Sequence, residues 1–341
     1  MSFSSRVIAW QQRYGRHGLP WQGGDAYRVW VSEIMLQQTQ VAAVIPYYQR
    51  FMARFPAPAV LAAAHEDEVL AHWSGLGYYT RARNLHRAAQ QIVAQYGGAF
   101  PDDFDAILAL PGIGRSTAAA ISAFAFGQRR AILDGNVKRV LARHQAIAGW
   151  PGDKRVESRL WQAAEALLPP SGVEAYTQGL MDLGALVCAR SKPRCGICPV
   201  AEDCRARLED RVAAFPAPRP RKTLPERETV FLLLQSEQGI VLEKRPAQGI
   251  WGGLWSLPEF AAEAEALQAS AAAGLQLISH ERLPGFSHTF THFRLHLAPL
   301  HGRVQSAGNA LPAGWRWFSV QAALEAGIPA PVRRILEGLP S

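Results

Sequence analysis

Four cysteines, the whole cysteine content of this 341-residue chain, stand close together in the sequence. They follow the spacing Cys188-x6-Cys195-x2-Cys198-x5-Cys204. Thiolates are soft ligands, so four of them in one segment favour zinc or an iron–sulfur cluster. Zinc modules usually present two tight cysteine pairs separated by a long spacer, so this single short loop fits a compact iron–sulfur cubane better. Four buried thiols without a metal are disfavoured, because prolines and a glycine mark the segment as a loop.

A glutamate with apolar neighbours is the first candidate for acid–base chemistry. Glu33 follows a helix start at Asp25 and stands among Val31, Ile34 and Leu36. A carboxyl group in apolar surroundings loses hydration, which raises its pKa and lets it stay protonated near neutral pH. A protonated carboxyl can act as a general acid. The alternative is an ordinary solvated glutamate on a helix surface.

A second acid stands at the predicted start of another helix. Asp134 precedes Gly135, Asn136 and an apolar-periodic run. An aspartate in this place is often only an N-cap, but the helix N-terminus would also keep its carboxylate ionised. One protonated and one ionised acid are the pair that cleavage of a glycosidic bond requires. Whether Glu33 and Asp134 face each other is left open by the sequence.

A glycine-containing turn separates two further predicted helices, residues 104–109 and 117–126. The turn Leu110-Pro-Gly-Ile-Gly114 is followed by Ser116 or Thr117 as the expected helix cap. Glycine lets a backbone approach a ligand closely, and free N–H groups at a helix start attract phosphate. The pattern therefore predicts a helix–hairpin–helix element for a DNA backbone, with a plain interhelical turn as the alternative.

The periodicity of the chain changes once along its length. Residues 1–215 read as successive helices, residues 216–226 as a proline-rich basic linker, and residues 227–341 as an α+β domain. In the last part, 229–234 and 240–243 flank a polar turn and predict a β-hairpin. Its predicted helices are residues 261–273, 320–326 and 331–338. We therefore expect a multi-domain protein.

The charge of the chain favours a polyanionic partner. The formal net charge is +8, and residues 1–215 carry 24 Lys and Arg against 18 Asp and Glu. Five of these cations lie in or beside the cysteine loop, where they outnumber two acids, which suits contact with phosphates. We find no apolar stretch long enough for a signal peptide or a membrane span, which predicts a soluble protein of a reducing compartment.

In combination, these features resemble the helix–hairpin–helix DNA glycosylase superfamily over residues 1–215, and within it the MutY-type adenine DNA glycosylases. The strings that carry the resemblance are Leu19-Pro-Trp21, Ser32-Glu-Ile-Met-Leu-Gln-Gln-Thr-Gln-Val41, Gly75-Leu-Gly-Tyr-Tyr79, Arg83-Asn-Leu-His86, Asp134-Gly-Asn-Val137 and Met181-Asp-Leu-Gly184. The resemblance implies an all-α glycosylase domain whose four cysteines hold a [4Fe–4S] cluster.

The resemblance also implies roles for individual residues. Glu33 would protonate the adenine at N7, Asp134 would stabilise the oxocarbenium-like sugar, and Asn136 would order the site. Further implied contacts are Trp21 and Gln178 with a flipped adenine, Gln38 and Tyr78 with the base stack, and Gly112, Gly114 and Ser116 with the DNA. The related bifunctional endonuclease III enzymes carry a lysine nucleophile where this chain has Ser116, so an imine with the sugar cannot form there.

Residues 227–341 resemble the Nudix-type domain that follows the catalytic domain in these proteins. A Nudix hydrolase needs a helix with Arg-Glu and paired glutamates for Mg²⁺, but residues 261–274 offer only Glu263 and Glu265. We therefore expect no pyrophosphatase activity. The string Phe286-Ser-His-Thr-Phe-Thr-His292 matches the family's lesion-reading loop, in which Phe290, Thr291 and His292 would recognise 8-oxoguanine. An ordinary packed strand is the alternative.

The sequence thus predicts a monofunctional adenine DNA glycosylase of base excision repair that hydrolyses the N-glycosidic bond of a flipped adenine. Its expected partner is double-stranded DNA with 8-oxoguanine:A or G:A mispairs, and we expect a cytoplasmic monomer without membrane contact, associated with the nucleoid in a bacterium. One alternative is a bifunctional endonuclease III-type glycosylase/lyase for oxidised pyrimidines. Another is a non-catalytic iron–sulfur DNA-binding protein, and a Nudix hydrolase is the least favoured.

Overall fold

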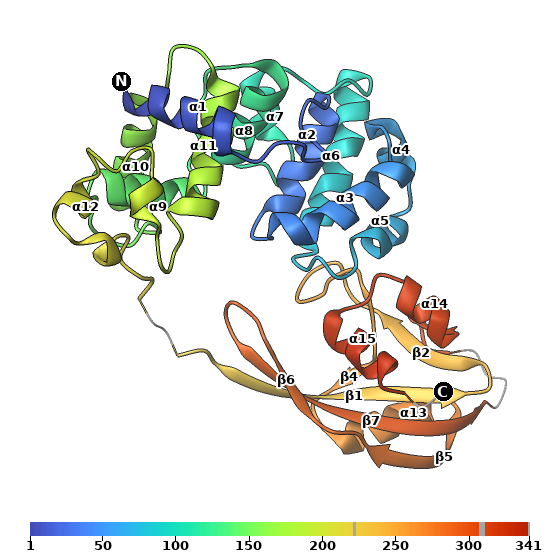
Figure 1. The fold of residues 1–341 in the computed structure, drawn as a ribbon. Coiled ribbons are helices and arrows are strands. Elements are labelled where there is room, and N and C mark those ends of the chain that lie inside the picture. Colours follow the sequence, from blue (N-terminus) through green and yellow to red (C-terminus); the bar gives the residue numbers. More distant parts are fainter. Residues whose placement is uncertain (221–222, 307–310, 340–341) are drawn as a thin grey trace. The chain divides into compact units, whose positions relative to one another are not determined.

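The computed structural model describes residues 1–220, 223–306 and 311–339, and the chain forms two compact units (Figure 1). Unit 1 comprises Met1–Ala62 and Arg87–Arg221, and unit 2 comprises Ala63–His86 and Lys222–Ser341. Arg221 and Lys222 of the predicted linker lie outside the described residues. The residues before them stay attached to unit 1, because Ala217 N donates to Gly149 O at 3.2 Å.

Unit 1 is helical, as predicted. Its α-helices are α1 (Phe3–Tyr14), α2 (Ala26–Leu36), α3 (Val41–Arg54), α4 (Pro58–Ala63, which ends at the unit boundary), the second part of α6 (Thr80–Tyr96), α7 (Phe104–Ala109), α8 (Arg115–Phe126), α9 (Gly135–His144), α10 (Lys154–Ala166), α11 (Val173–Asp182) and α12 (Arg205–Leu208). A π-helical turn η1 (Leu183–Val187) and two 3-10 turns, η2 (Cys195–Ile197) and η3 (Val212–Ala214), complete it.

Aspartates begin several of these helices. Asp25, Asp134 and Asp153 are the N-caps of α2, α9 and α10, and each accepts a hydrogen bond from a backbone N–H of the first turn. Such caps satisfy N–H groups that would otherwise lack partners. The cap predicted for α8 is wrong. The helix begins at Arg115 with Gly114 as its cap, so the cap lies two residues before Ser116 and three before Thr117.

The helices of unit 1 gather in two groups (Figure 1). In one group α9 packs against α10, α11 and α12, and in the other α2 packs against α3. Helix α8 contacts both α2 and α11, so it connects the groups. The buried core of the first group includes Val137, Val140, Leu141, Leu160 and Leu180. In the part of the chain that the structure covers, no helix is long and apolar enough to cross a membrane.

Unit 2 is built on a mixed β-sheet, which confirms the predicted α+β domain. Its strands are β1 (Glu226–Ser236), β2 (Gly239–Lys244), β3 (Trp255–Ser256), β4 (Glu259–Phe260), β5 (Leu275–Arg282), β6 (Phe286–Thr289), β7 (Arg294–Ser306) and β8 (Trp315–Phe318). The sheet order is β3-β2-β1-β7-β5, with β4 on β1, β6 on β7 and β8 on β2. Strands β1 and β7 run parallel, whereas β1 and β2 form the predicted antiparallel hairpin.

Besides the last residue of α4, Ala63, unit 2 contains five helices or parts of helices within the residues that the structure places. They are α5 (Glu66–Trp73), the first turns of α6, α13 (Glu263–Ala272), α14 (Val320–Glu325) and α15 (Ala330–Glu337). The last three confirm the helices expected near residues 261–273, 320–326 and 331–338. Buried Leu232, Leu234, Val241 and Leu300 form the core beneath α13.

The two units differ from the two predicted domains in one segment. Residues 63–86 were expected to belong to the helical domain but group with the C-terminal residues. The Asp67 carboxylate forms an ion pair with Lys244, and Tyr79 OH donates to Ile328 O at 3.1 Å. These are tertiary contacts between segments far apart in sequence, which helical periodicity does not report.

Candidate active site

A cavity of about 830 Å³ lies between the two groups of helices in unit 1. It is lined by α2 and the residues after it, by the first turn of α8, by the start of α9 and by η1. The lining residues that carry the argument are Glu33, Gln38, Ser116, Asp134, Asn136 and Arg139. Both predicted acids therefore line one cavity.

The carboxyl group of Glu33 sits on the cavity face of α2. Its neighbours Ile34 and Met35 are buried, at 2% and 0% exposure. Desolvation, and secondarily the charge of Asp134, raise the pKa of Glu33 from 4.5 to about 8. The direction agrees with the predicted protonated glutamate, because burial penalises the charged form. The role of Glu33 as a proton donor stays a prediction.

Asp134 does begin α9, but its predicted electrostatics need correction. Its Oδ1 accepts from Val137 N at 2.7 Å, as an N-cap should. Burial nevertheless raises the pKa of Asp134, against the lowering effects of that N–H, of the Arg139 charge and of Asn136. Desolvation outweighs the helix N-terminus here. The three contacts that stabilise a charged form belong to Asp134, whereas both causes given for Glu33 raise its pKa.

Arg139 holds the Asn136 side chain against the cavity. Asn136 Oδ1 accepts from Arg139 Nη2 at 2.9 Å, while Asn136 Nδ2 lies 3.4 Å from Asp134 Oδ2. Arg139 also donates to Gly184 O at 2.7 Å and to Cys188 O at 2.8 Å. A Cβ at Gly184 would lie 2.5 Å from Asn136 Cβ, so η1 packs directly on the start of α9. Sequence reasoning missed Arg139, although its i, i+3 spacing from Asn136 places both on one helix face.

The helix–hairpin–helix element is present as predicted. Helices α7 and α8 flank the turn, in which Gly112 has a left-handed φ of 81° that glycine adopts without strain. Gln37 Nε2 lies 3.4 Å from both Gly112 O and Thr117 Oγ1 and ties α2 to the hairpin. Ser116 Oγ accepts from Leu133 N at 2.9 Å, so this hydroxyl positions the residue beside Asp134.

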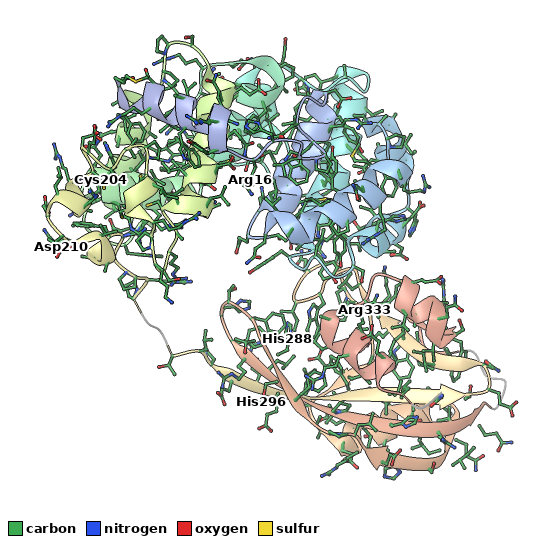
Figure 2. All side chains as sticks on the ribbon, viewed as in Figure 1. Arg16, Cys204, Asp210, His288, His296 and Arg333 are labelled. Atoms are coloured by element: carbon green, nitrogen blue, oxygen red, sulfur yellow. The ribbon has the colours of Figure 1, made fainter. Side chains whose placement is uncertain are left out.

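Trp21 and Gln178 come together in a second cavity of about 350 Å³, separate from the one that Glu33 lines. Gln178 also contacts a buried carboxylate: its Nε2 donates to Asp182 Oδ1 at 2.8 Å. Arg16, labelled in Figure 2, donates from Nε to the same oxygen at 2.7 Å and lines the first cavity. Because the Gln178 amide donates to Asp182 through Nε2, its oxygen Oε1 remains available as an acceptor for a ligand.

The two residues predicted to enter the base stack share an uncommon backbone conformation. Gln38 follows α2 with φ 57°, is exposed and lines the first cavity. Tyr78, in unit 2, precedes α6 with φ 49° and is 49% exposed. Left-handed residues with side chains are strained and gather at functional sites. Gln38 belongs to unit 1 and Tyr78 to unit 2.

The four cysteines lie around one loop of unit 1, with Cys204 (Figure 2) at the cap of α12. Burial, with smaller contributions from the other three thiols, raises the pKa of Cys198 to about 11. Arg143 Nη1 lies 3.3 Å from Cys188 Sγ, and Cys204 Sγ lies 3.6 Å from Arg143 O. Among the described residues no group of three or more His, Cys, Asp or Glu is arranged to hold a metal ion. The donor set itself, four mutually interacting thiols in a basic loop, fits a thiolate-bound cluster.

The predicted lesion-reading residues lie at the turn between β6 and β7. Figure 2 shows His288 near the tip of this hairpin and His296 farther along it. The Phe290 ring stacks on Phe293 with centroids 4.5 Å apart and lies 5.2 Å from the Trp251 ring. Thr291 and His292 are exposed. Two buried rings, Trp251 and Phe293, thus support the half-buried Phe290, next to the exposed side chains of Thr291 and His292.

Fold and site together define a helix–hairpin–helix DNA glycosylase domain followed by a Nudix-like domain. Residues 31–166 match the family described as "HhH-GPD superfamily base excision DNA repair protein", and residues 229–338 match "NUDIX domain". A solved structure described as a thermostable thymine-DNA glycosylase matches with a TM-score of 0.55 and 29% identity, covering 61% of this chain and 95% of that one. A non-covalent endonuclease III–DNA complex (TM-score 0.52, 21% identity, covering 62% and 99%) shares the fold of the same part.

Curated relatives match over nearly the whole chain. The adenine DNA glycosylase of Buchnera aphidicola subsp. Acyrthosiphon pisum is 40% identical, covering 98% of this chain and 97% of its own. The human adenine DNA glycosylase is 33% identical, covering 98% of this chain and 73% of its own. The chain belongs to the adenine DNA glycosylase (MutY) family and is therefore an enzyme of the DNA N-glycosylase class.

Proposed function

We propose that this enzyme removes adenine mispaired with 8-oxoguanine, and also with guanine, from double-stranded DNA in base excision repair. The observation that carries the proposal is the pair of acids in one cavity, Glu33 with a pKa raised to about 8 and Asp134 at the cap of α9. The names of the relatives support adenine as the base. Extruding a mispaired base from the stack costs less than extruding a paired one, which favours mispairs.

The proposed chemistry uses a protonated Glu33 and an ionised Asp134. The Glu33 carboxyl donates its proton to adenine N7, and the C1′–N9 bond breaks with its electron pair moving to the base. The Asp134 carboxylate stabilises the cationic sugar, and water then adds its oxygen to C1′ while its proton passes to a carboxylate. Asn136, held by Arg139, keeps the Asp134 oxygens in place. The product is free adenine and an abasic site.

We expect base release without strand cleavage by an imine route. At the position that would need an amine, the Ser116 hydroxyl accepts from Leu133 N. Lys138 is engaged with Glu157, at 2.6 Å between Nζ and Oε1. Incubation with an 8-oxoguanine:A duplex should therefore release free adenine and leave an intact abasic strand, resolved on a gel before and after alkali. Efficient borohydride trapping with release of an oxidised pyrimidine would favour the bifunctional alternative, and duplex binding without base release would favour the non-catalytic one.

We propose that Gln178 recognises the adenine amino group. Because N6 and N7 are neighbouring groups of one base, an adenine bound at Glu33 must then extend into the second cavity, whose lining includes the adjacent Ser32 of α2. Since Asp182 takes its amide nitrogen, the Gln178 oxygen can accept from the N6 amine but not from the O6 of guanine. Gln178→Met should slow release of adenine by about tenfold, the size of one hydrogen bond to a buried partner.

The matched substrate is purine, which lacks the amino group. Gln178→Met should leave the single-turnover rate for purine nearly unchanged, so that the adenine-to-purine rate ratio falls. The glycosidic bonds of adenine and purine break at different intrinsic rates. Comparing the adenine-to-purine rate ratio of the variant with that of the unmodified enzyme cancels this difference. Equal slowing on both bases would contradict this role of Gln178.

We propose that Cys188, Cys195, Cys198 and Cys204 bind a [4Fe–4S] cluster. Bound there, the cluster would supply a rigid attachment for the basic loop rather than a reacting group. The purified protein should be yellow-brown with four iron and four sulfide per chain, and Cys198→Ser should lose the visible absorption and bind duplex DNA more weakly. An active, colourless protein loaded with zinc would contradict the iron assignment and leave the glycosylase assignment standing.

We propose that Phe290, Thr291 and His292 of the β6–β7 turn recognise 8-oxoguanine, with the Thr291 hydroxyl as donor or acceptor.

The absence of pyrophosphatase activity stays a prediction. It is supported by the local engagement of both glutamates of α13: Glu263 pairs with Arg282 at 2.5 Å, and Glu265 accepts from Ala261 N at 3.3 Å. Hydrolysis of nucleoside diphosphate derivatives would overturn it.

A further inference from the structure

The Tyr78 loop, residues Ser74 to Tyr79, joins α5 to α6 through several left-handed residues. Gly75, Gly77 and Tyr78 have φ values of 101°, 71° and 49°. Glycine adopts this conformation freely, but a tyrosine does so only when its surroundings impose it. The left-handed conformation of Tyr78 therefore depends on the contacts that hold the rest of the loop.

Some of the support comes from the flanking helices. Trp73 Nε1 donates to Gly77 O at 3.2 Å. The guanidinium of Arg81, which is 7% exposed, donates through Nη2 to Leu76 O at 3.2 Å and to Gly77 O at 3.1 Å. These contacts fix the carbonyl groups that immediately precede Tyr78.

The rest of the support comes from residues more than 240 positions later in the chain. Ile328 O, between α14 and α15, accepts from Tyr79 OH at 3.1 Å and from Ser74 Oγ at 3.4 Å. Tyr79 OH in turn accepts from Gly75 N at 3.3 Å. The buried Tyr79 hydroxyl thus connects the first turn of the loop to the C-terminal segment.

The Ile328 carbonyl is itself held in place. The preceding Gly327 O accepts from Trp255 N at 3.0 Å. A Cβ at Gly327 would lie 3.0 Å from Leu70 Cβ and 3.1 Å from Leu70 C. The backbone of Gly327 therefore packs directly on α5, which only glycine permits without displacement of that helix.

A second attachment lies beside the β6–β7 turn. Arg83, in the first turn of α6, donates to Gly252 O. The neighbouring Trp251, itself left-handed with φ 54°, has its ring 5.2 Å from that of Phe290 and 5.8 Å from that of His288. The same short segment thus contacts both α6 and the turn proposed to read the lesion.

We propose that the C-terminal domain holds the Tyr78 loop in its DNA-inserting conformation, with Tyr79 as the positioning residue that connects them. This rests on the proposed function, in which Tyr78 enters the base stack beside the mispair. Residues 63–86 belong by sequence to the helical domain, but their conformation is set by C-terminal residues. The turn that would read the lesion and the loop that would enter the base stack are thereby both held by residues of the C-terminal domain.

The first test is a double-mutant cycle with single-turnover release of adenine from an 8-oxoguanine:A duplex. Tyr79→Phe should slow release about fivefold to tenfold in the native background and less than about twofold in a Tyr78→Ala background, because Tyr79 acts through Tyr78. The matched control is Tyr27→Phe, which removes another buried hydroxyl that donates to a backbone carbonyl, Phe55 O, at 2.7 Å. Its effect should be the same in both backgrounds. An equal effect of Tyr79→Phe in both would overturn the proposal.

The second test does not depend on activity. Tyr79→Phe, and Gly327→Ala from the C-terminal side, should each speed amide hydrogen exchange in residues 74–80 by about tenfold or more, whereas Tyr27→Phe should not. Unchanged exchange in both variants would overturn the positioning role. Failure of the unmodified enzyme to release adenine would overturn the proposed function instead, and the exchange result would still decide the role of Tyr79.

Discussion

Replacing Glu33 by glutamine is expected to abolish release of adenine while leaving duplex binding intact. Glutamine keeps the size and polarity of the side chain but has no proton to give to the base. General acid catalysis contributes about 10²–10⁴-fold, so the single-turnover rate should fall by that factor. The measurement is adenine release from an 8-oxoguanine:A duplex at saturating enzyme, with the dissociation constant determined in parallel.

The matched control is Glu157→Gln, the same chemical change at an ion pair with Lys138 outside the cavity lining. It should release adenine at nearly the unmodified rate. A Glu33→Gln enzyme that stays within about tenfold of the unmodified rate would remove Glu33 from the role of general acid. Loss of duplex binding in that variant would point instead to a structural role for the glutamate.

The same variant should be more stable than the unmodified enzyme at alkaline pH. The folded-state pKa of Glu33, about 8, lies above the ordinary value of 4.5, so the folded protein binds this proton more tightly than the unfolded chain does. Stability associated with Glu33 is therefore full below pH 4.5 and is lost as pH rises toward 8. At pH 9 the free energy of unfolding of the glutamine variant should be larger by on the order of a few kcal/mol, so it should unfold at a higher temperature. At pH 4.5 the two should nearly coincide. Parallel Tm curves across this range would contradict the raised pKa.

Local sequence pattern predicted much of the fold because it is set locally. The helical half, the glycine turn before α8, the Asp134 cap and the β1–β2 hairpin all depend on periodicity, turn residues and capping chemistry. Glu33 was singled out in the same way, since its apolar neighbours in the sequence marked α2 as a largely buried helix.

What the sequence did not predict depends on distant contacts. The pKa direction of Asp134 was wrong because burial between two groups of helices outweighs the helix N-terminus, and that burial is a tertiary property. The cap of α8 was wrong because the helix begins at Arg115, which places Ser116 inside its first turn, where its hydroxyl accepts from Leu133 N. The Arg16–Asp182 pair that orients Gln178 joins residues 166 positions apart, and no local signal announces it.

Replacing Asp134 by asparagine isolates the role of its negative charge. Asparagine is as good an N-cap as aspartate, so Val137 N keeps its partner and α9 keeps its start. The cationic sugar loses its stabilising carboxylate, and the rate of adenine release should fall by about 10²–10³-fold, the size of a lost electrostatic contact in a preorganised site. The matched control is Asp153→Asn at the cap of α10, which should leave the rate unchanged.

The substitution has a second consequence that ties the two acids together. The charge of Asp134 is one of the two causes that raise the pKa of Glu33, after desolvation. In Asp134→Asn the pKa of Glu33 should fall below 8 but stay above 4.5, because burial persists. The gain in stability of Glu33→Gln over its parent begins near pH 4.5 in both backgrounds, but in the Asp134→Asn background it should level off at a lower pH and be smaller at pH 9. A plateau at the same pH and of the same size would show that the two carboxyl groups titrate independently.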